Sequence, residues 1–329
     1  GTGKTVTVVE ATWQLLLQDV STRVLLCAPS NAAADVLCDR LRKLGLAPAE
    51  LHRFCWTSRK LEFILPALLP YCAQGADGKL SYLSLDDLLS KRVIVSTCFA
   101  AGVLSGIGVP AGHFAAVFVD EAGQASEAET TVPLANFAFD AGGCDTVTVL
   151  AGDPLQLGTV CRSKHARAGG YATSLLERLM GLPMYASREA HGLLLTKLLN
   201  NYRSHAQILH MSSSAFYDNE LRACADPRET DCCLEWGQIA ESAFPVLFYG
   251  VEGEAVCPQD SVSPFNIFEA NTVADLVVEL LADADLAVTA ADFGIVAPYR
   301  NQVKEIRRVL RQRDLASVRV GTVDDYQGQ

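Results

Sequence analysis

The sequence predicts an α/β protein with two domains, each a parallel sheet flanked by helices. Short runs of β-branched and apolar residues alternate with helical patterns, and each run ends in a polar or glycine-containing turn. This series starts near the first residue and starts again near Leu195. The 329 residues are 50% hydrophobic, which is enough apolar material for two buried cores. We therefore predict one domain over residues 1–194 and a second over residues 195–329.

The first domain is predicted to contain four strands that are covered on both faces. Runs of this length and apolar character are typical of the inner strands of parallel sheets. The predicted strands cover residues 24–27, 93–96, 117–119 and 147–150. A helix is expected at 32–44, where Leu37, Leu41 and Leu44 recur at helical spacing.

Between residues 48 and 90 the alternation of strands and helices lapses. The segment 52–69 has a helical pattern, 75–78 has a turn pattern, and 83–89 has the pattern of a short helix. We therefore expect a small helical insertion in the first domain at about 48–90.

The second domain repeats the alternation of strands and helices around a loop-like segment. That segment, 250–263, is rich in Gly, Pro, Glu and Asp. The predicted strands are 245–249, 293–296 and 318–323, and the predicted helices are 270–281 and 302–312. Two sheets of this kind leave a cleft between domains, which is a usual place for a ligand.

The composition excludes some classes of protein. No run approaches the roughly 18 apolar residues of a membrane helix, so we expect no membrane partner. The net charge of −11 argues weakly against nucleic-acid binding, although a groove can be locally basic in an acidic protein. The eleven cysteines include no CxxC pair, and Cys224, Cys232 and Cys233 lack suitably spaced histidines. Reduced intracellular thiols are the favoured interpretation, with a zinc site as the alternative.

The chain opens with Gly1-Thr2-Gly3-Lys4-Thr5, the second half of a P-loop pattern. In such a loop, N–H groups at a helix N-terminus hold phosphates. Lys4 would reach the β- and γ-phosphates, and the Thr5 hydroxyl would bind Mg²⁺. An apolar helical pattern follows at 6–18, as this arrangement requires. A glycine-rich turn with a chance Lys-Thr pair is the alternative.

Two strand ends supply the other groups that nucleotide hydrolysis needs. After the strand at 117–119, Asp120 would bind Mg²⁺ and Glu121 would orient or deprotonate the attacking water. After the strand at 147–150, Gln156 would contact the γ-phosphate or that water. Solvated acids at a strand end and an ordinary Asp-Pro loop are the alternatives.

Three further turns carry residues suited to phosphates and bases. In the second domain, Arg203 would act as an arginine finger on the transferring phosphoryl group, and Tyr202 would stack on adenine. The turns 28–31 and 297–302 each follow a strand and open a helix, so they would grip a nucleic-acid backbone, with Tyr299 stacking on a base. Helix capping is the alternative for these turns.

The order of these motifs resembles that of superfamily 1 RNA helicases of the up-frameshift-like group. The motifs are GTGKT, APSN, VDEAGQA, LAGDPLQL, NYRSH, APYRNQ and VGTVDDYQGQ, and they span residues 1 to 329. The run Asp120–Gly123 looks like the DEAG box of the Mov-ten/Armitage branch. Within that branch, 65–72 and 112–127 look closest to the plant silencing-defective RNA helicase.

The resemblance implies two RecA-like domains and an ATP-dependent RNA helicase. Its cofactors would be ATP and Mg²⁺, and it would translocate 5′ to 3′ on single-stranded RNA in small-RNA-mediated silencing. A cytoplasmic location, in ribonucleoprotein granules among other places, and partners among silencing-complex proteins are also implied. The implied nucleotide residues are Gly1, Thr2, Gly3, Lys4, Thr5, Asp120, Glu121, Gln156, Tyr202 and Arg203. The implied nucleic-acid residues are Pro29, Ser30, Asn31, Ser96, Thr97, Pro298, Tyr299 and Thr322.

The sequence departs from this family in several places. Thr159 stands where the family has proline. The first half of the P-loop, the adenine-recognising glutamine motif and the second arginine finger lie outside the sequence. We therefore expect residues 1–329 alone to bind ATP poorly and to unwind nothing. An ATP-switched RNA clamp without unwinding and a DNA helicase of the same superfamily are the alternative functions.

Overall fold

The computed structural model describes residues 1–139, 146–186, 192–239 and 244–326. The chain forms two compact units. The larger unit is Gly3–Leu198, and the smaller unit is Leu199–Gln329 together with Gly1–Thr2. The limits predicted for the RecA-like domains, 1–194 and 195–329, stay a prediction.

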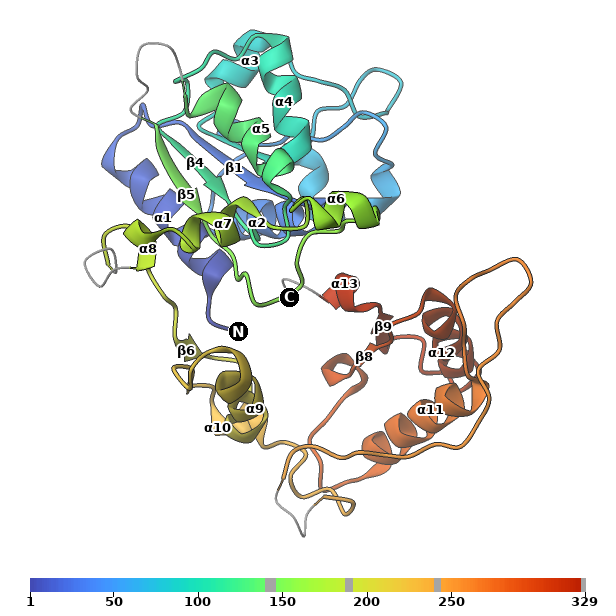
Figure 1. Cartoon of the computed structure of the whole chain (residues 1–329). Coiled ribbons are helices and arrows are strands. Elements are labelled where there is room, and N and C mark those ends of the chain that lie inside the picture. The colour runs from blue at the N-terminus through green and yellow to red at the C-terminus, as the bar shows by residue number, and fades with distance from the viewer. Residues whose placement is uncertain (140–145, 187–191, 240–243, 327–329) are drawn as a thin grey trace. The chain divides into compact units, whose positions relative to one another are not determined.

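A five-stranded parallel sheet forms the centre of the larger unit (Figure 1). Its strands are β1 (Val24–Ala28), β2 (Leu51–Arg53), β3 (Val93–Thr97), β4 (Ala116–Val119) and β5 (Val147–Leu150). They lie in the order β2-β3-β1-β4-β5. All four predicted strands of this unit are present, and the α/β fold class is confirmed. The prediction that all four are covered on both faces is wrong for β5, which lies at the end of the sheet with Val147 59% exposed. The strand order places the turns after β1, β3, β4 and β5 on one edge of the sheet, since parallel strands share their carboxyl edge.

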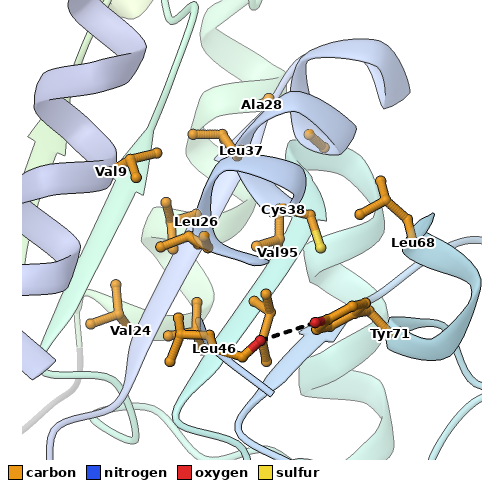
Figure 2. Close-up of a cluster of buried hydrophobic side chains, with 14 of the residues drawn as sticks. Val9, Val24, Leu26, Ala28, Leu37, Cys38, Leu46, Leu68, Tyr71 and Val95 are labelled. Carbon is orange, nitrogen blue, oxygen red and sulfur yellow. Dashed lines mark hydrogen bonds between the residues drawn. The ribbon is translucent and has the colours of Figure 1, made fainter. Parts of the chain in front are cut away.

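Helices cover both faces of this sheet. The helices of the larger unit are α1 (Lys4–Gln18), α2 (Asn31–Lys43), α3 (Leu85–Ser90), α4 (Cys98–Ile107), α5 (Glu127–Phe137), α6 (Lys164–Ala168), α7 (Leu175–Met180) and α8 (Pro183–Ala186). Alternate residues of β1 point to opposite faces, so Leu26 packs with α1 and α2, while Leu25 packs with α4 and α5. Figure 2 shows the first of these clusters, in which the Tyr71 hydroxyl donates to the Leu46 carbonyl at 3.0 Å.

The predicted helix at 52–69 is wrong. His52 lies in the buried strand β2, which pairs with β3 at the end of the sheet. Two short 3-10 helices, η1 (Leu61–Phe63) and η2 (Pro66–Tyr71), follow it. Pro66 and Pro70 have no N–H to donate, which opposes a continuous helix here. The turn at 75–78 and the helix near 83–89 are present, the latter as α3.

The smaller unit contains two pairs of short parallel strands and a helical core. The strands are β6 (Asn200–Asn201) with β7 (Arg222–Ala223), and β8 (Gly294–Val296) with β9 (Arg319–Gly321). The helices are α9 (Ala206–Phe216), α10 (Pro227–Thr230), α11 (Ile267–Ala282), η3 (Ala290–Asp292), α12 (Arg300–Gln312) and α13 (Val323–Tyr326). Ala274 of α11, Ile306 of α12 and Val320 of β9 share one buried cluster.

Two strand predictions in the smaller unit need correction. The run 245–249 is not a strand, and Phe248 is 94% exposed. A strand needs a partner for its backbone groups, and no described strand pairs with this run. The strand predicted at 318–323 ends at Gly321, because the Asp325 carboxylate accepts from the Thr322 N–H and hydroxyl and α13 begins there. Within the described residues, no helix is long and apolar enough to cross a membrane.

Candidate nucleotide site

The N-terminus of α1 has no side-chain cap and is suited to an anion. Gly3 precedes the helix with φ of 85°, a left-handed conformation that favours glycine. No side chain caps the first N–H groups, and the first turn contains no acidic residue. Uncapped N–H groups and the helix dipole attract phosphate. The residues present therefore fit the phosphates of a nucleotide.

The two residues predicted to hold Mg²⁺ are in contact. The Thr5 hydroxyl donates to Oδ2 of Asp120 at 2.8 Å. Asp120 is buried at the end of β4, and its N–H donates to the Cys27 carbonyl at 2.8 Å. Burial raises the pKa of the Asp120 carboxyl, whereas the Thr5 hydroxyl and the Lys4 ammonium lower it. A hydroxyl and a carboxylate in contact are oxygen ligands that Mg²⁺ accepts.

Glu121 lies in a strained and mostly buried position beside these residues. Its φ is 53°, a left-handed conformation that costs free energy for a residue with a side chain and that occurs often at functional sites. Gln124 donates to its carboxylate at 2.9 Å. Burial is the largest cause of its raised pKa, and the charges of Asp120 and Asp153 add to it. Lys4 acts in the opposite direction. A carboxyl held in this way suits proton transfer.

The turns after β4 and β5 touch each other through their backbones. The Ala122 N–H donates to the Ala151 carbonyl at 2.8 Å. A Cβ added at Gly123 would lie 2.6 Å from the Asp153 carbonyl oxygen, and one at Gly152 would lie 2.7 Å from the Gly123 nitrogen. Both positions therefore require glycine, because the backbones of the two turns approach each other closely. The sequence showed Gly123 only as part of a family motif.

Gln156 is exposed in the turn after β5, where its amide donates to the Asp153 carboxylate at 2.6 Å. Asp153 also accepts from the Leu155 N–H at 3.0 Å, which stabilises the turn. Sequence reasoning named neither Asp153 nor Gln124 as a site residue. An acid that precedes a proline and a glutamine that follows an acid pair are weak sequence signals. The structure shows that each contacts a predicted site residue, Asp153 through Gln156 and Gln124 through Glu121.

The turns after β1 and β3 combine exposed polar groups with capping roles. Ser30 and Asn31 are exposed, and the Ser30 hydroxyl caps α2 by accepting from the Ala33 N–H at 3.1 Å. Pro29 is half-buried. Thr97 caps α4. Ser96 is fully buried, with its hydroxyl donating to the Thr97 carbonyl at 3.0 Å, so its side chain presents no atom to a ligand in this structure.

In the smaller unit, Tyr202 and Arg203 are both exposed. The Asn201 side-chain oxygen accepts from the Arg203 and Ser204 N–H groups, each at 2.9 Å, and this fixes the turn. No described residue pairs with the Arg203 guanidinium. Within the same unit the Gly1 carbonyl accepts from the Tyr202 N–H at 3.0 Å. Thr2 is half-buried.

The remaining predicted residues lie near the N-termini of two helices. Pro298 and Tyr299 are exposed immediately before α12. The Thr322 hydroxyl donates to the Asp325 carboxylate at 3.0 Å at the start of α13. Pro298 and Tyr299 therefore present side chains to solvent, while Thr322 has a capping role.

An uncapped helix start suited to phosphate, a hydroxyl–carboxylate pair and a buried glutamate on one edge of a parallel sheet are the features of a P-loop NTPase core. Two family models, both described as "AAA domain", match residues 1–54 with 84–164 and residues 171–329. The relatives are consistent with this class. "RNA helicase Mov10l1" of Homo sapiens is 43% identical, over 100% of this chain and 27% of that protein. "Putative helicase mov-10-B.1" of Danio rerio is 39% identical, over 100% and 34%.

A third relative, "Probable RNA helicase armi" of Drosophila melanogaster, is 33% identical over 100% of this chain and 30% of that protein. The chain belongs to the Mov-ten/Armitage branch of the superfamily 1 helicases. It spans about a third, or less, of the length of these relatives. The likeness to the plant enzyme within this branch stays a prediction.

Proposed function

We propose that the protein containing this chain is an ATP-dependent RNA helicase that translocates 5′ to 3′ on single-stranded RNA. The observation that supports it most directly is the Thr5–Asp120 contact beside Glu121 at the uncapped N-terminus of α1. These are the groups that hold a nucleotide and its metal in this class of enzyme. Membership of a helicase family supports the coupling of hydrolysis to a nucleic-acid strand.

The hydrolytic step uses groups of the larger unit. Lys4 and the first N–H groups of α1 bind the phosphates. Thr5 and Asp120 would hold Mg²⁺, which neutralises charge on the phosphates when it is bound. Glu121 orients the attacking water and accepts its proton, and its raised pKa favours that transfer. Gln156 leaves Asp153 to contact the γ-phosphate, which makes the turn after β5 sensitive to the nucleotide.

Residues of the smaller unit complete the proposed cycle. Arg203 is exposed on a fixed turn and would stabilise charge on the transferring phosphoryl group, while Tyr202 would stack on adenine. Binding of ATP would close the two units, and hydrolysis would reopen them. Alternate grip by the Ser30–Asn31 turn and by Pro298–Tyr299, with Thr322, would then move the motor along the strand.

The biological setting is also part of the proposal. The names of the human and Drosophila relatives contain the words RNA helicase, which favours RNA over DNA as the strand. We propose a role in small-RNA-mediated silencing in the cytoplasm, with silencing-complex proteins as partners.

The test uses the full-length protein. Lys4→Ala removes the phosphate-binding ammonium and Glu121→Gln removes the proton acceptor, so each should reduce RNA-stimulated ATP turnover to background. Glu127→Gln is the matched control, because Glu127 is a partly exposed acid whose only described ion pair is with Arg178. Unchanged turnover in either site variant would overturn the proposal.

Two further measurements separate the alternatives. A strand-displacement assay on a tailed duplex distinguishes a motor from an ATP-switched clamp, because a clamp binds and displaces nothing. Comparison of ATP turnover on RNA and DNA strands of equal length distinguishes the RNA helicase from a DNA helicase of the same superfamily.

A further inference from the structure

Two aromatic side chains lie together on the surface of the larger unit. The ring centroids of Trp56 and Phe99 are 5.8 Å apart, with planes inclined by 31°. Phe99 is 64% exposed and Trp56 is 39% exposed. An aromatic ring that stays exposed to water does not gain the favourable free energy of burial. An exposed pair of such rings in contact therefore indicates a ligand-binding position rather than a core position.

The topology places this aromatic pair on the edge that carries the nucleotide residues. Trp56 follows β2, Phe99 follows Thr97 at the end of β3, and Ser30 follows β1. Since β2, β3, β1 and β4 are neighbours in that order and parallel, their carboxyl ends form one continuous edge. Three strand spacings of about 4.8 Å put β2 roughly 14 Å from β4, which ends at Asp120.

A buried hydrogen-bond network joins the segment before Trp56 to the Ser30–Asn31 turn. The guanidinium of Arg53 is fully buried and donates to the Asn31 side-chain oxygen at 3.0 Å. The same group donates to the Phe54 carbonyl at 2.6 Å and to Asp35 at 2.9 Å. One guanidinium therefore joins the segment that carries Trp56 to the start of α2. The backbone that leads to Trp56 is therefore fixed, which reduces the entropy lost on binding.

The chain has no net positive charge to attract a phosphate backbone. Its net charge is −11, and Lys60, the exposed cation closest in sequence to Trp56, pairs with Glu62 at 3.5 Å. Base–aromatic stacking supplies affinity without positive charge and accepts every base. A strand that crosses this edge past the exposed Ser30 and Asn31 would bring its bases toward the aromatic pair.

We propose that Trp56 and Phe99 form a stacking platform for a base of a single-stranded nucleic acid. The two rings are already in contact, so the base stacks on the outer face of the pair and not between them. This inference rests on the proposed function, to which it adds a base contact in the larger unit. Neither residue was among those predicted from the sequence.

The test measures strand binding by the full-length protein, using fluorescence anisotropy with oligouridylate, oligothymidylate and abasic strands of about 15 nucleotides. Trp56→Ala and Phe99→Ala should each weaken binding of the base-containing strands about 5- to 150-fold. The loss should be similar at about 50 and 200 mM salt, since no phosphate contact is removed. Binding of the abasic strand should not change. Comparing the uridylate and thymidylate strands shows whether the platform serves RNA, DNA or both.

Two control variants separate stacking from folding. Phe63→Ala removes a neighbouring aromatic that is 69% exposed and outside the pair, so it should leave binding unchanged. Trp56→Phe keeps an aromatic face and should restore most of the affinity lost in Trp56→Ala. Thermal unfolding of each variant shows that it is folded. Failure of Trp56→Phe to restore binding would overturn the proposal.

Three other results would overturn the platform. These are wild-type affinity in both alanine variants, an equal loss on the abasic strand, and absence of strand binding by the wild-type protein. Wild-type affinity together with loss of a protein partner would assign the pair to a protein interface instead. If Lys4→Ala keeps its RNA-stimulated turnover while Trp56→Ala loses base binding, the proposed motor fails and the platform stands.

Discussion

Burial of His52 in β2 makes the stability of the larger unit depend on pH. Desolvation lowers the pKa of His52 from 6.5 to about 4, and the nearby Lys91 adds to this effect. Between about pH 6.5 and pH 4, the His52 side chain is protonated in the unfolded chain and neutral in the folded chain. This contribution to stability is therefore complete above pH 6.5 and is lost as the pH falls toward 4.

The variant His52→Gln tests this dependence. The glutamine side chain does not titrate. When the pH falls from 7 to 5, the free energy of unfolding of this variant should therefore decrease by about 2 kcal/mol less than that of wild type. Urea unfolding at the two pH values measures the difference. The matched control is His165→Gln, since His165 is exposed and its variant should keep the wild-type dependence. An identical pH dependence in wild type and His52→Gln would contradict the prediction.

Asp35 is the only carboxylate among the described residues that pairs with the buried guanidinium groups of Arg53 and Arg59. Asp35→Asn leaves both cations buried without a counter-charge, which should cost about 3–5 kcal/mol of unfolding free energy. Asp39 on the same helix offers the control. It pairs with Arg42 and Lys43, which lie closer to solvent, so Asp39→Asn should cost about 0.3–0.5 kcal/mol per pair. Equal losses of unfolding free energy in Asp35→Asn and Asp39→Asn, measured by urea unfolding, would show that the buried ion pairs contribute no more to stability than the partly exposed ones.

The nucleotide-site candidates could be predicted from the sequence where the motif that contains them is a short continuous segment. Lys4, Thr5, Asp120 and Glu121 follow patterns in which residue type and spacing predict a role, and the structure brings them together. Their roles in binding and hydrolysis stay a prediction. Arg53 was not predictable, because its partners come from α2 and β3 and no local pattern marks a buried arginine. Trp56 and Phe99 were missed for the same reason.

Close backbone approach of the turns after β4 and β5 gives a test of the Gly123 position. In Gly123→Ala the new methyl would meet the Asp153 carbonyl oxygen at 2.6 Å, so the turn that carries Gln156 must shift. We expect a loss of about 1–3 kcal/mol of unfolding free energy and a lower rate of ATP turnover in the full-length protein. Gly106→Ala is the control within α4, where nothing lies within 4 Å of an added Cβ. It should be neutral or stabilise the helix by about 0.5–1 kcal/mol. A stable and fully active Gly123→Ala would show that the turns can separate without consequence.

The inner strands of the larger unit were predictable because burial on both faces demands continuous apolar runs. The inner strands β1, β3 and β4 lie where those runs are, and β5 also lies at a predicted run, although it is at the end of the sheet and only partly buried. The edge strand β2 was not found, since it has three residues and two of them, His52 and Arg53, are polar. Its burial depends on partners that are distant in sequence. The exposed run at 245–249 shows the converse, that apolar residues alone do not make a strand without a neighbour to pair with.

The chain has separate buried cores in its two units, and this predicts two unfolding transitions. Leu37 belongs to a core of the Gly3–Leu198 unit, while Ile306 belongs to the core that α11 and α12 form in the other unit. Leu37→Ala and Ile306→Ala should each remove about 2–5 kcal/mol from one transition only, because the lost contacts stay within one core. Hydrogen exchange followed by mass spectrometry measures each core separately. Trp236, buried in the smaller unit, is a fluorescent probe of that unit. If both variants shift a single transition to the same extent, the two cores unfold as one cooperative unit and the division is wrong.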